Sequence, residues 1–441
     1  MSDHDGLLEL GQRAVEMSPA DETEVIVSRG ASGLTRYANN TIHQNVTQAS
    51  TALRVRAAFG RRVGVATAND LSDEGMRRCV KRAADIARHQ EENEEYLGLP
   101  GPAEYAKVEA DYGGSARFSP EDRAAAVREI IRVAEADGLT ASGAFSTGGS
   151  AMAIANSKGV AATDTGASAD INVTMTGPTS TGRATRTAMN VAEIDAEEIA
   201  RVAARKAVES ADPIEIEPGE HTVVLEEDAV GDLIGQLGWM GFGGKAFVEQ
   251  RSFMSGKIGQ RVCGENITLY DDGLDPRFFP WPFDYEGVPR QKVMLIENGI
   301  ARAVVHDRTT AARAGVAPTG HALAAPATWG PFPGHLHLVP GDSSVEEMIA
   351  STERGLLVTR FHYTNAAHPI RTELTGMTRD GTFLIENGKL TRGVKNLRFT
   401  QGVLGALSEV ELIGKRTRIA EGSLVPALKV RRFRFSGATE F

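Results

Sequence analysis

Residues 34–46 read LTRYANNTIHQNV, two short strand-like runs joined by Asn39-Asn40. Asparagine tolerates the positive φ angles of a tight hairpin loop, so this stretch predicts an antiparallel hairpin. Further strand-like runs lie on both sides, at 24–28, 51–58 and 61–66. This succession of short strands predicts an antiparallel meander near the start of the chain.

Capping signals predict helices around this meander. Ser72 is an expected N-cap, and Ser119-Pro120 combines a capping serine with a proline at the first helical position. The expected helices cover residues 7–17, 72–91, 120–138 and 196–210. Four more strands are expected between residues 141 and 188, with a hairpin turn at 156–159.

A stretch rich in proline and acid, residues 212–219, marks the expected domain boundary. Beyond it the chain is mostly strand-like, and the run Leu-Ile-Glu-Asn-Gly occurs twice, at 295–299 and 384–388. Asn-Gly after an apolar run is a strong hairpin signal. We therefore expect an α+β fold: residues 1–213 form an N-terminal domain of antiparallel strands and long helices, and residues 214–441 form a largely β domain.

Composition narrows the class of protein. The chain has 441 residues and a formal net charge of −10, which argues against binding nucleic acid through charge. It has no run of 18 apolar residues, so no membrane span is expected. Two cysteines, Cys79 and Cys263, cannot form a disulfide scaffold in a chain of this length. A cytoplasmic location is the expectation.

The glycine-rich run at residues 238–244 follows a helix, whereas a dinucleotide-binding loop follows a strand. It is expected to be a mobile loop. Its aromatic residues, Trp239 and Phe242, are alternatively expected to be exposed and to line a substrate groove or a partner surface. No P-loop, Gly-x-Ser-x-Gly elbow or His-Glu-x-x-His motif is present.

An acidic run, Glu227-Asp228-Ala229-Val230-Gly231-Asp232, begins a predicted helix after a short strand at residues 222–225. Acids at a helix N-terminus are favoured by the helix dipole. Carboxylates in this position also bind hard cations, so both readings remain open.

Histidines gather in the second half of the chain. His335 and His337 alternate on a strand-like stretch, so both imidazoles are expected on one face. With His362 or His368 as a third donor, they would make a metal site. The alternative is that they are ordinary half-buried strand residues.

Several stretches, in order and spacing, resemble the TldD/PmbA (TldE) family, whose members were once described as modulators of DNA gyrase. The matching stretches are residues 38–42, 54–64, 223–232, 252–259, 338–341 and 425–430, together with the two Leu-Ile-Glu-Asn-Gly hairpins. The resemblance implies a two-domain α+β protein with a metallopeptidase-like C-terminal domain. In this family a TldD-type subunit pairs with a TldE/PmbA-type subunit, and the complex cleaves unfolded peptides.

The TldD type carries His-Glu-x-x-x-His on a central helix and a later cysteine that completes the zinc site. In this sequence Glu227 stands at the first His position, Asp228 at the Glu position and Asp232 at the second His position. No cysteine follows Cys263. Because imidazole and thiolate are the ligands that zinc prefers, we expect no zinc in this chain.

The resemblance therefore favours a TldE/PmbA-like, non-catalytic subunit of a heteromeric metallopeptidase that acts on unfolded peptides. Its expected partner is a zinc-containing TldD-type subunit in a heterodimer, or a second copy of itself in a homodimer. Whether the chain is itself an enzyme remains open. The alternatives are an active metal-dependent hydrolase with a relocated histidine site and a non-enzymatic peptide-binding module.

Overall fold

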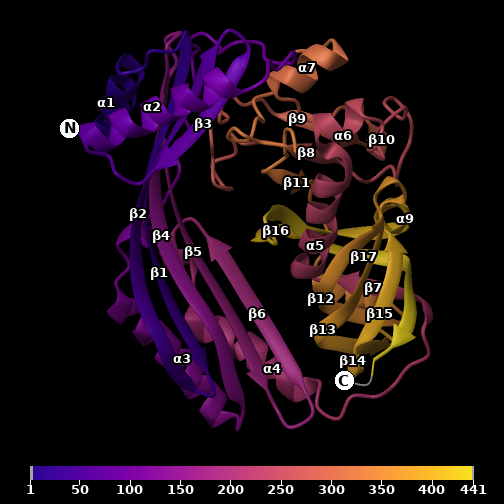
Figure 1. Cartoon of the computed structure of the whole chain (residues 1–441). Coiled ribbons are helices and arrows are strands. Elements are labelled where there is room, and N and C mark those ends of the chain that lie inside the picture. The colour runs from indigo at the N-terminus through magenta and orange to yellow at the C-terminus, as the bar shows by residue number, and fades with distance from the viewer. Residues whose placement is uncertain (1–2, 440–441) are drawn as a thin grey trace.

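A six-stranded antiparallel sheet forms the first half of the structure, a computed structural model that describes residues 3–439 (Figure 1). The spatial order of its strands is β3-β2-β1-β4-β5-β6. The strands are β1 (Glu22–Ala38), β2 (Thr41–Phe59), β3 (Arg62–Ala68), β4 (Thr140–Asn156), β5 (Ala161–Thr176) and β6 (Thr181–Ala188). The predicted meander is confirmed as β1, β2 and β3, and the Asn39-Asn40 turn joins the first two with φ angles of 51° and 55°.

The strands are longer and fewer than predicted. The runs at 24–28 and 34–38 belong to the one strand β1, and three strands, not four, fill residues 140–188. The glycines and serines of residues 28–33 predict a break between the two runs. Pairing with β2 on one side and β4 on the other continues through these residues, and the ladder hydrogen bonds keep the backbone extended.

Four long helices cover one face of this sheet, and all four were predicted to within a few residues. They are α1 (Asp3–Glu16), α2 (Asp73–His89), α3 (Pro120–Ala136) and α4 (Ala196–Glu209). The Ser72 hydroxyl accepts a hydrogen bond from the Gly75 amide, and Ser119 forms a capping box with Asp122. Both predicted caps are therefore present.

Alternation along β1 separates the two faces of the sheet. Val25 and Val27 pack with α1 and α2, and Tyr37 packs with α3 and α4. Ile26 points the opposite way and packs with Phe283 of the second half. One face of the sheet thus carries the helices, and the other faces the second half of the molecule (Figure 1).

The second half is built on an eleven-stranded sheet within the described residues. Its strands are β7 (Gly219–Leu225), β8 (Leu269–Asp271), β9 (Val293–Glu297), β10 (Ile300–Ala301), β11 (Leu336–Leu338), β12 (Arg354–His368), β13 (Glu373–Glu386), β14 (Lys389–Gly393), β15 (Leu397–Gly402), β16 (Val410–Ala420) and β17 (Ser423–Ala438). Because β17 pairs with both β15 and β7, the strands β17-β15-β13-β12-β7 close into a ring. The α+β fold class is confirmed.

Shorter helices decorate this half of the molecule. They are α5 (Glu227–Leu237), α6 (Gly244–Val248), α7 (Arg308–Ala314), α8 (Val345–Ala350) and α9 (Val403–Ser408), with single turns η1 (Ser115–Arg117), η2 (Val191–Glu193), η3 (Gly238–Phe242) and η4 (Pro369–Arg371) along the chain. Both Asn-Gly hairpins are confirmed, as the β9–β10 and β13–β14 turns. Over residues 3–439, no helix has the length and apolar content needed to cross a membrane.

The two halves meet along β6. This edge strand of the first sheet contacts β13 and β16 of the second, and α5 packs against β12, β16 and β17. The start of α5 consequently lies where the two halves of the chain come together (Figure 1).

Candidate functional site

The acidic run predicted from the sequence lies at the first turn of α5. Strand β7 ends at Leu225, and Glu226 occupies the N-cap with its carboxylate 2.5 Å from the Lys206 ammonium of α4. A Cβ added to Gly231 would lie 2.4 Å from the Ala420 carbonyl oxygen. Glycine at this position therefore lets α5 lie directly against β16, which brings the acids of α5 close to the end of that strand.

An arginine of β16 neutralises two of these acids. Asp228 is only 4 % exposed, and its Oδ1 lies 2.9 Å from Nη2 of Arg418. The Nε atom of Arg418 lies 3.2 Å from Glu227 Oε2. Burial opposes the charge of Arg418, but Asp228 and Glu227 outweigh that effect and hold its pKa above the ordinary value.

A threonine of β6 completes this cluster from the first sheet. The Thr185 hydroxyl donates to Asp228 Oδ2 at 2.8 Å. The Thr185 hydroxyl oxygen also accepts a hydrogen bond from Arg418 Nη1 at 3.1 Å. The polar contacts of Asp228 therefore join both halves of the molecule.

Two further acids lie nearby and form no ion pair with an arginine of the described residues. Burial raises the pKa of Asp232, and a hydrogen bond from the Thr364 hydroxyl only partly offsets it. Burial also raises the pKa of Glu421, and the charges of Asp228 and Asp232 raise it further. Among the neighbouring cations, Arg360 is itself paired with Asp380 at 2.6 Å. The site is thus a dense network of acids and arginines.

The donor set of this network does not fit zinc. Within the described residues, no three His, Cys, Asp or Glu side chains form a group that could hold a metal ion. The positions that resemble the metal motif offer carboxylates alone, and the Arg418 guanidinium already binds two of them. Cys263 is buried, which raises the pKa of its thiol to about 12, so it is not a ready thiolate ligand.

His335 and His337 share one face, as predicted, and both pack against the neighbouring loop that contains Phe278. Both rings contact the Phe278 ring, with centroid distances of 5.5 Å. His335 Nε2–H donates to the Phe279 carbonyl at 2.9 Å, and its Nδ1 accepts from Arg290 at 3.2 Å. Burial, followed by the charge of Arg290, lowers the pKa of His335 to about 4, so the imidazole is neutral.

The other two histidines have different neighbours. His362 lies near Arg360 and Arg379, and burial together with these charges lowers its pKa. His368 is exposed, and its Nδ1 accepts from the Arg371 amide at 3.4 Å. Within residues 3–439 neither joins His337 in a group that could hold a metal ion, and the His337 ring stacks on Tyr270 with a centroid distance of 4.7 Å. The four histidines therefore do not assemble into one ligand group.

The two aromatic residues of the glycine-rich run differ in solvent exposure. Trp239 is 60 % exposed and contacts the 76 % exposed Trp329 edge-to-face at 5.9 Å. Phe242 is fully buried against Phe253, so the expectation that it is exposed is wrong. The run forms the π-helical turn η3, with Trp239 on its exposed side and Phe242 on its buried side.

Comparison with protein families agrees with this architecture. A model described as the PmbA/TldA metallopeptidase C-terminal domain matches residues 218–437, and one described as PmbA/TldA metallopeptidase domain 1 matches residues 23–87. The chain belongs to the PmbA/TldD family. It is therefore related to metallopeptidases of the TldD/PmbA type.

Individual relatives in the family are distant in sequence and close in fold. A metalloprotease of Methanothermobacter thermautotrophicus is 26 % identical over 52 % of this chain and 50 % of its own length. A metalloprotease TldD homolog of Haemophilus influenzae is 26 % identical over 51 % of this chain and 46 % of its own. The chain thus spans about half the length of these relatives. The crystal structure of TldE from Thermococcus kodakarensis superposes with a TM-score of 0.88 at 23 % identity, over 98 % of this chain and 99 % of that one.

Two members of the acidic site, Arg418 and Thr185, were not predicted from the sequence. Nothing in the sequence marks them: Arg418 is one of several basic residues in a run, and Thr185 is one of many threonines. Arg418 and Glu227 are separated by 191 positions. Only the packing of β16 and β6 around α5 brings these side chains together.

Proposed function

We propose that this chain is a non-catalytic, TldE/PmbA-like subunit that pairs with a TldD-type metallopeptidase subunit and helps it bind unfolded peptides. One observation carries the proposal: Arg418 binds Glu227, which stands at the first His position of the family's motif, and Asp228, which stands at the Glu position. A guanidinium between these carboxylates supplies the positive charge that a metal ion would supply, and it activates no water. Bond cleavage then belongs to the partner, whose zinc supplies a hydroxide at neutral pH.

The likeness to TldE adds support at the level of the fold. It covers nearly the whole of both chains, so the arrangement of the two sheets is common to the two proteins. We also propose a cytoplasmic location, since Cys79 and Cys263 are both free thiols.

An exposed aromatic pair is the proposed contact with the partner subunit. Trp239 and Trp329 lie edge-to-face, and Phe332 packs on Trp239 with a centroid distance of 4.4 Å. Large exposed aromatic side chains are enriched at protein interfaces. Covering these rings in a complex would remove a large apolar area from water.

The test of the function is reconstitution. The chain is purified alone and together with a TldD-type subunit, and both samples are assayed for zinc and for cleavage of an unstructured peptide. We expect zinc and cleavage in the co-purified sample, and neither in the chain alone. Full cleavage by the chain alone would overturn the proposal, as would a TldD-type subunit that binds it no better than it binds an unrelated protein.

The test of the interface uses the double variant Trp239→Ser/Trp329→Ser. We expect the TldD-type subunit to bind this variant at least ~10-fold more weakly, as for the loss of interface anchor residues. Val208→Ser is the control, because Val208 is also exposed but lies on α4. Equal binding of both variants would place the interface elsewhere.

A further inference from the structure

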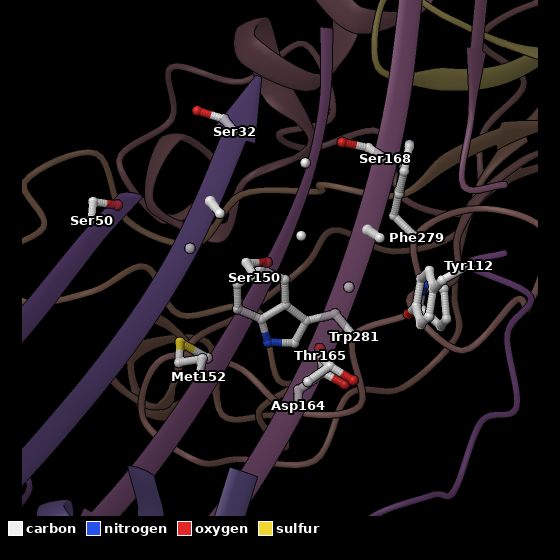
Figure 2. A pocket seen from close by; sticks show the side chains of 17 residues that line it. Ser32, Ser50, Tyr112, Ser150, Met152, Asp164, Thr165, Ser168, Phe279 and Trp281 are labelled. Carbon is white, nitrogen blue, oxygen red and sulfur yellow. The ribbon is translucent and has the colours of Figure 1, made fainter. Parts of the chain in front are cut away.

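A further acid, the partly buried Asp164, lines a cavity between the two halves of the molecule. It is distant in sequence from the acids of α5. The cavity has a volume of about 550 Å³, within the usual range of ligand pockets. Its floor is the helix-free face of the first sheet, where β1, β4 and β5 lie side by side (Figure 2). Its wall is formed by Tyr112 and by residues 279–281 of the second half.

The floor of the cavity is flat because small residues lie next to each other on three strands. Gly30 pairs with Ser150, and Ser150 pairs with Gly166, so one row across the sheet has no large side chain. A Cβ added to Gly166 would meet no atom closer than 4.0 Å, and one added to Gly30 none closer than 3.5 Å. Both glycines therefore leave open space that a side chain would fill.

The aromatic wall is held rigidly over this floor. Trp281 stands between Pro280 and Pro282, whose rings fix their own φ angles. Its amide donates to the Gly273 carbonyl at 2.7 Å. The neighbouring Phe279 has a φ of 43°, and its carbonyl accepts from His335. The wall is consequently fixed by contacts outside the cavity.

Two polar groups in the cavity are only partly satisfied in the described part of the protein: the Asp164 carboxylate accepts a backbone hydrogen bond from Thr165 but has no cation, and the Trp281 indole N–H has no acceptor. Asp164 makes no ion pair there, although it lines the cavity beside the Tyr112 ring. The indole N–H of Trp281 is buried without a protein acceptor. Ser150, Asp164 and the indole of Trp281 line the same cavity (Figure 2). Buried polar groups usually find partners, so the unpaired Trp281 N–H, beside a carboxylate that lacks a cation, points to a ligand.

The Asp164 carboxylate and the Trp281 N–H define the chemistry of that ligand. A carboxylate flanked by aromatic rings is suited to a cation, which gains both a charge pair and cation–π contacts. An indole N–H needs an acceptor such as a peptide carbonyl. The net charge of −10 also attracts cationic ligands to the protein. Among the described residues that line the cavity, none is basic and competes for Asp164.

We propose that this cavity binds the lysine or arginine side chain of an extended peptide, with Asp164 holding the cation and the Trp281 N–H binding a peptide carbonyl. The proposal rests on the proposed function only in taking a peptide as the ligand. It assigns the first domain a preference for basic residues in the bound peptide.

The experiment measures binding of short peptides to the full chain by isothermal titration calorimetry at pH 7.5. The probes are acetyl-Ala-Ala-Lys-Ala-Ala-amide, its arginine analogue, and matched peptides with norleucine or glutamate in the central position. We expect the lysine and arginine peptides to bind at least ~10-fold more tightly than the norleucine peptide, and the glutamate peptide not to bind.

Three variants separate the parts of the proposal. Asp164→Asn should weaken the lysine peptide about 10-fold and leave the norleucine peptide unchanged. Trp281→Phe keeps an aromatic ring and removes the N–H, so it should weaken both peptides alike. Gly166→Val fills the floor and should abolish binding of both. Asp137→Asn is the matched control, because Asp137 is an exposed acid at the end of α3.

Each outcome bears on the proposal. Equal binding of the lysine and norleucine peptides, no binding of any peptide, or an Asp164→Asn variant that binds lysine peptide like the parent chain would each overturn it. The reconstitution assay separates this result from the proposed function. If the complex cleaves an unstructured peptide while the lysine peptide does not bind here, the cavity proposal fails and the subunit role stands. If the lysine peptide binds as expected while no complex forms, the subunit role fails and the cavity proposal stands.

Discussion

The acids at the start of α5 and Asp164 in the cavity are both partly or fully buried, yet they differ in what surrounds them. Asp228 is bound by Arg418 and Thr185, so its charge is satisfied within the protein. Asp164 forms no ion pair with the described residues, and burial raises its pKa to about 6 although a hydrogen bond from the Thr165 backbone partly offsets this. A paired acid stabilises a junction, whereas an unpaired acid in a cavity is available to a ligand.

The largest loss of stability is expected when the arginine of the α5 cluster is removed. Arg418→Ala leaves Asp228 buried without a cation, and breaking a buried ion pair in this way costs about 3–5 kcal/mol of unfolding free energy. Urea denaturation of the variant and the parent chain measures the difference. Arg418→Lys keeps the charge and loses the forked geometry, so it should recover only part of the loss.

Arg432→Ala is the control for this measurement. Arg432 pairs with Glu409 on the surface, and exposed ion pairs contribute little to stability. If Arg418→Ala destabilised the chain no more than Arg432→Ala does, the α5 cluster would not be a buried, paired network.

The stability that His335 contributes behind the cavity wall should depend on pH. His335 has a folded pKa of about 4, below its ordinary value of 6.5, so its neutral form stabilises the fold. Its contribution is present above pH 6.5 and is lost as the pH falls through about 4, because the unfolded chain takes up the proton first. The shift corresponds to roughly 3 kcal/mol.

His335→Gln provides the comparison, since glutamine can donate to the Phe279 carbonyl but does not titrate. Denaturation at a series of pH values between 7.5 and 4 should show a shallower loss of stability for the variant than for the parent chain. Parallel curves would mean that His335 titrates normally and does not hold residue 279 as a neutral imidazole.

The effect of Asp164 on stability should change with pH in the direction opposite to that of His335. Asp164 has a folded pKa of about 6, above the ordinary value of 3.8, so the ionised form destabilises the fold. Relative to the parent chain, Asp164→Asn should therefore gain about 1–2 kcal/mol at pH 7.5, after allowance for partial solvent exposure, and nothing at pH 3.5. Thermal or urea denaturation at the two pH values measures the gain.

A destabilising Asp164→Asn at pH 7.5 would show that the carboxylate has a partner in the folded protein. Asp164 would then be a paired acid like Asp228, and the contrast between the two residues would disappear. A gain of stability would instead indicate that the parent chain retains an unpaired charge at some cost, as ligand sites commonly do.

The smallest effect is the pH dependence of ligand binding. Between pH 5 and pH 7 the ionised fraction of Asp164 rises about tenfold, so the affinity for the lysine peptide should rise by about the same factor. Tyr112 is the other titratable side chain lining the cavity, and its pKa of about 12 keeps it neutral over this range. Calorimetry with Asp164→Asn should show a flat profile, and a parallel rise in the variant would assign the dependence to another group.

The sequence by itself determined the local structure. Caps at Ser72 and Ser119 and turns at Asn-Gly and Asn39-Asn40 were readable because they depend on residues within a few positions of each other. The lack of histidine and of a late cysteine at the metal-motif positions was also plain from the sequence. Strand lengths were misjudged, since pairing partners on both sides decide whether a glycine-rich run stays extended.

Only the tertiary structure decided which charges are paired. Sequence identified Glu227 and Asp228 as acids at a helix start, but the packing of β16 against α5 brings Arg418 to them from 191 positions away. Packing against Phe253 buried Phe242, whereas Trp239 stayed exposed. Asp164 was indistinguishable from any other strand acid, because a charge becomes functional through burial and missing partners, and both are set by segments distant in the chain.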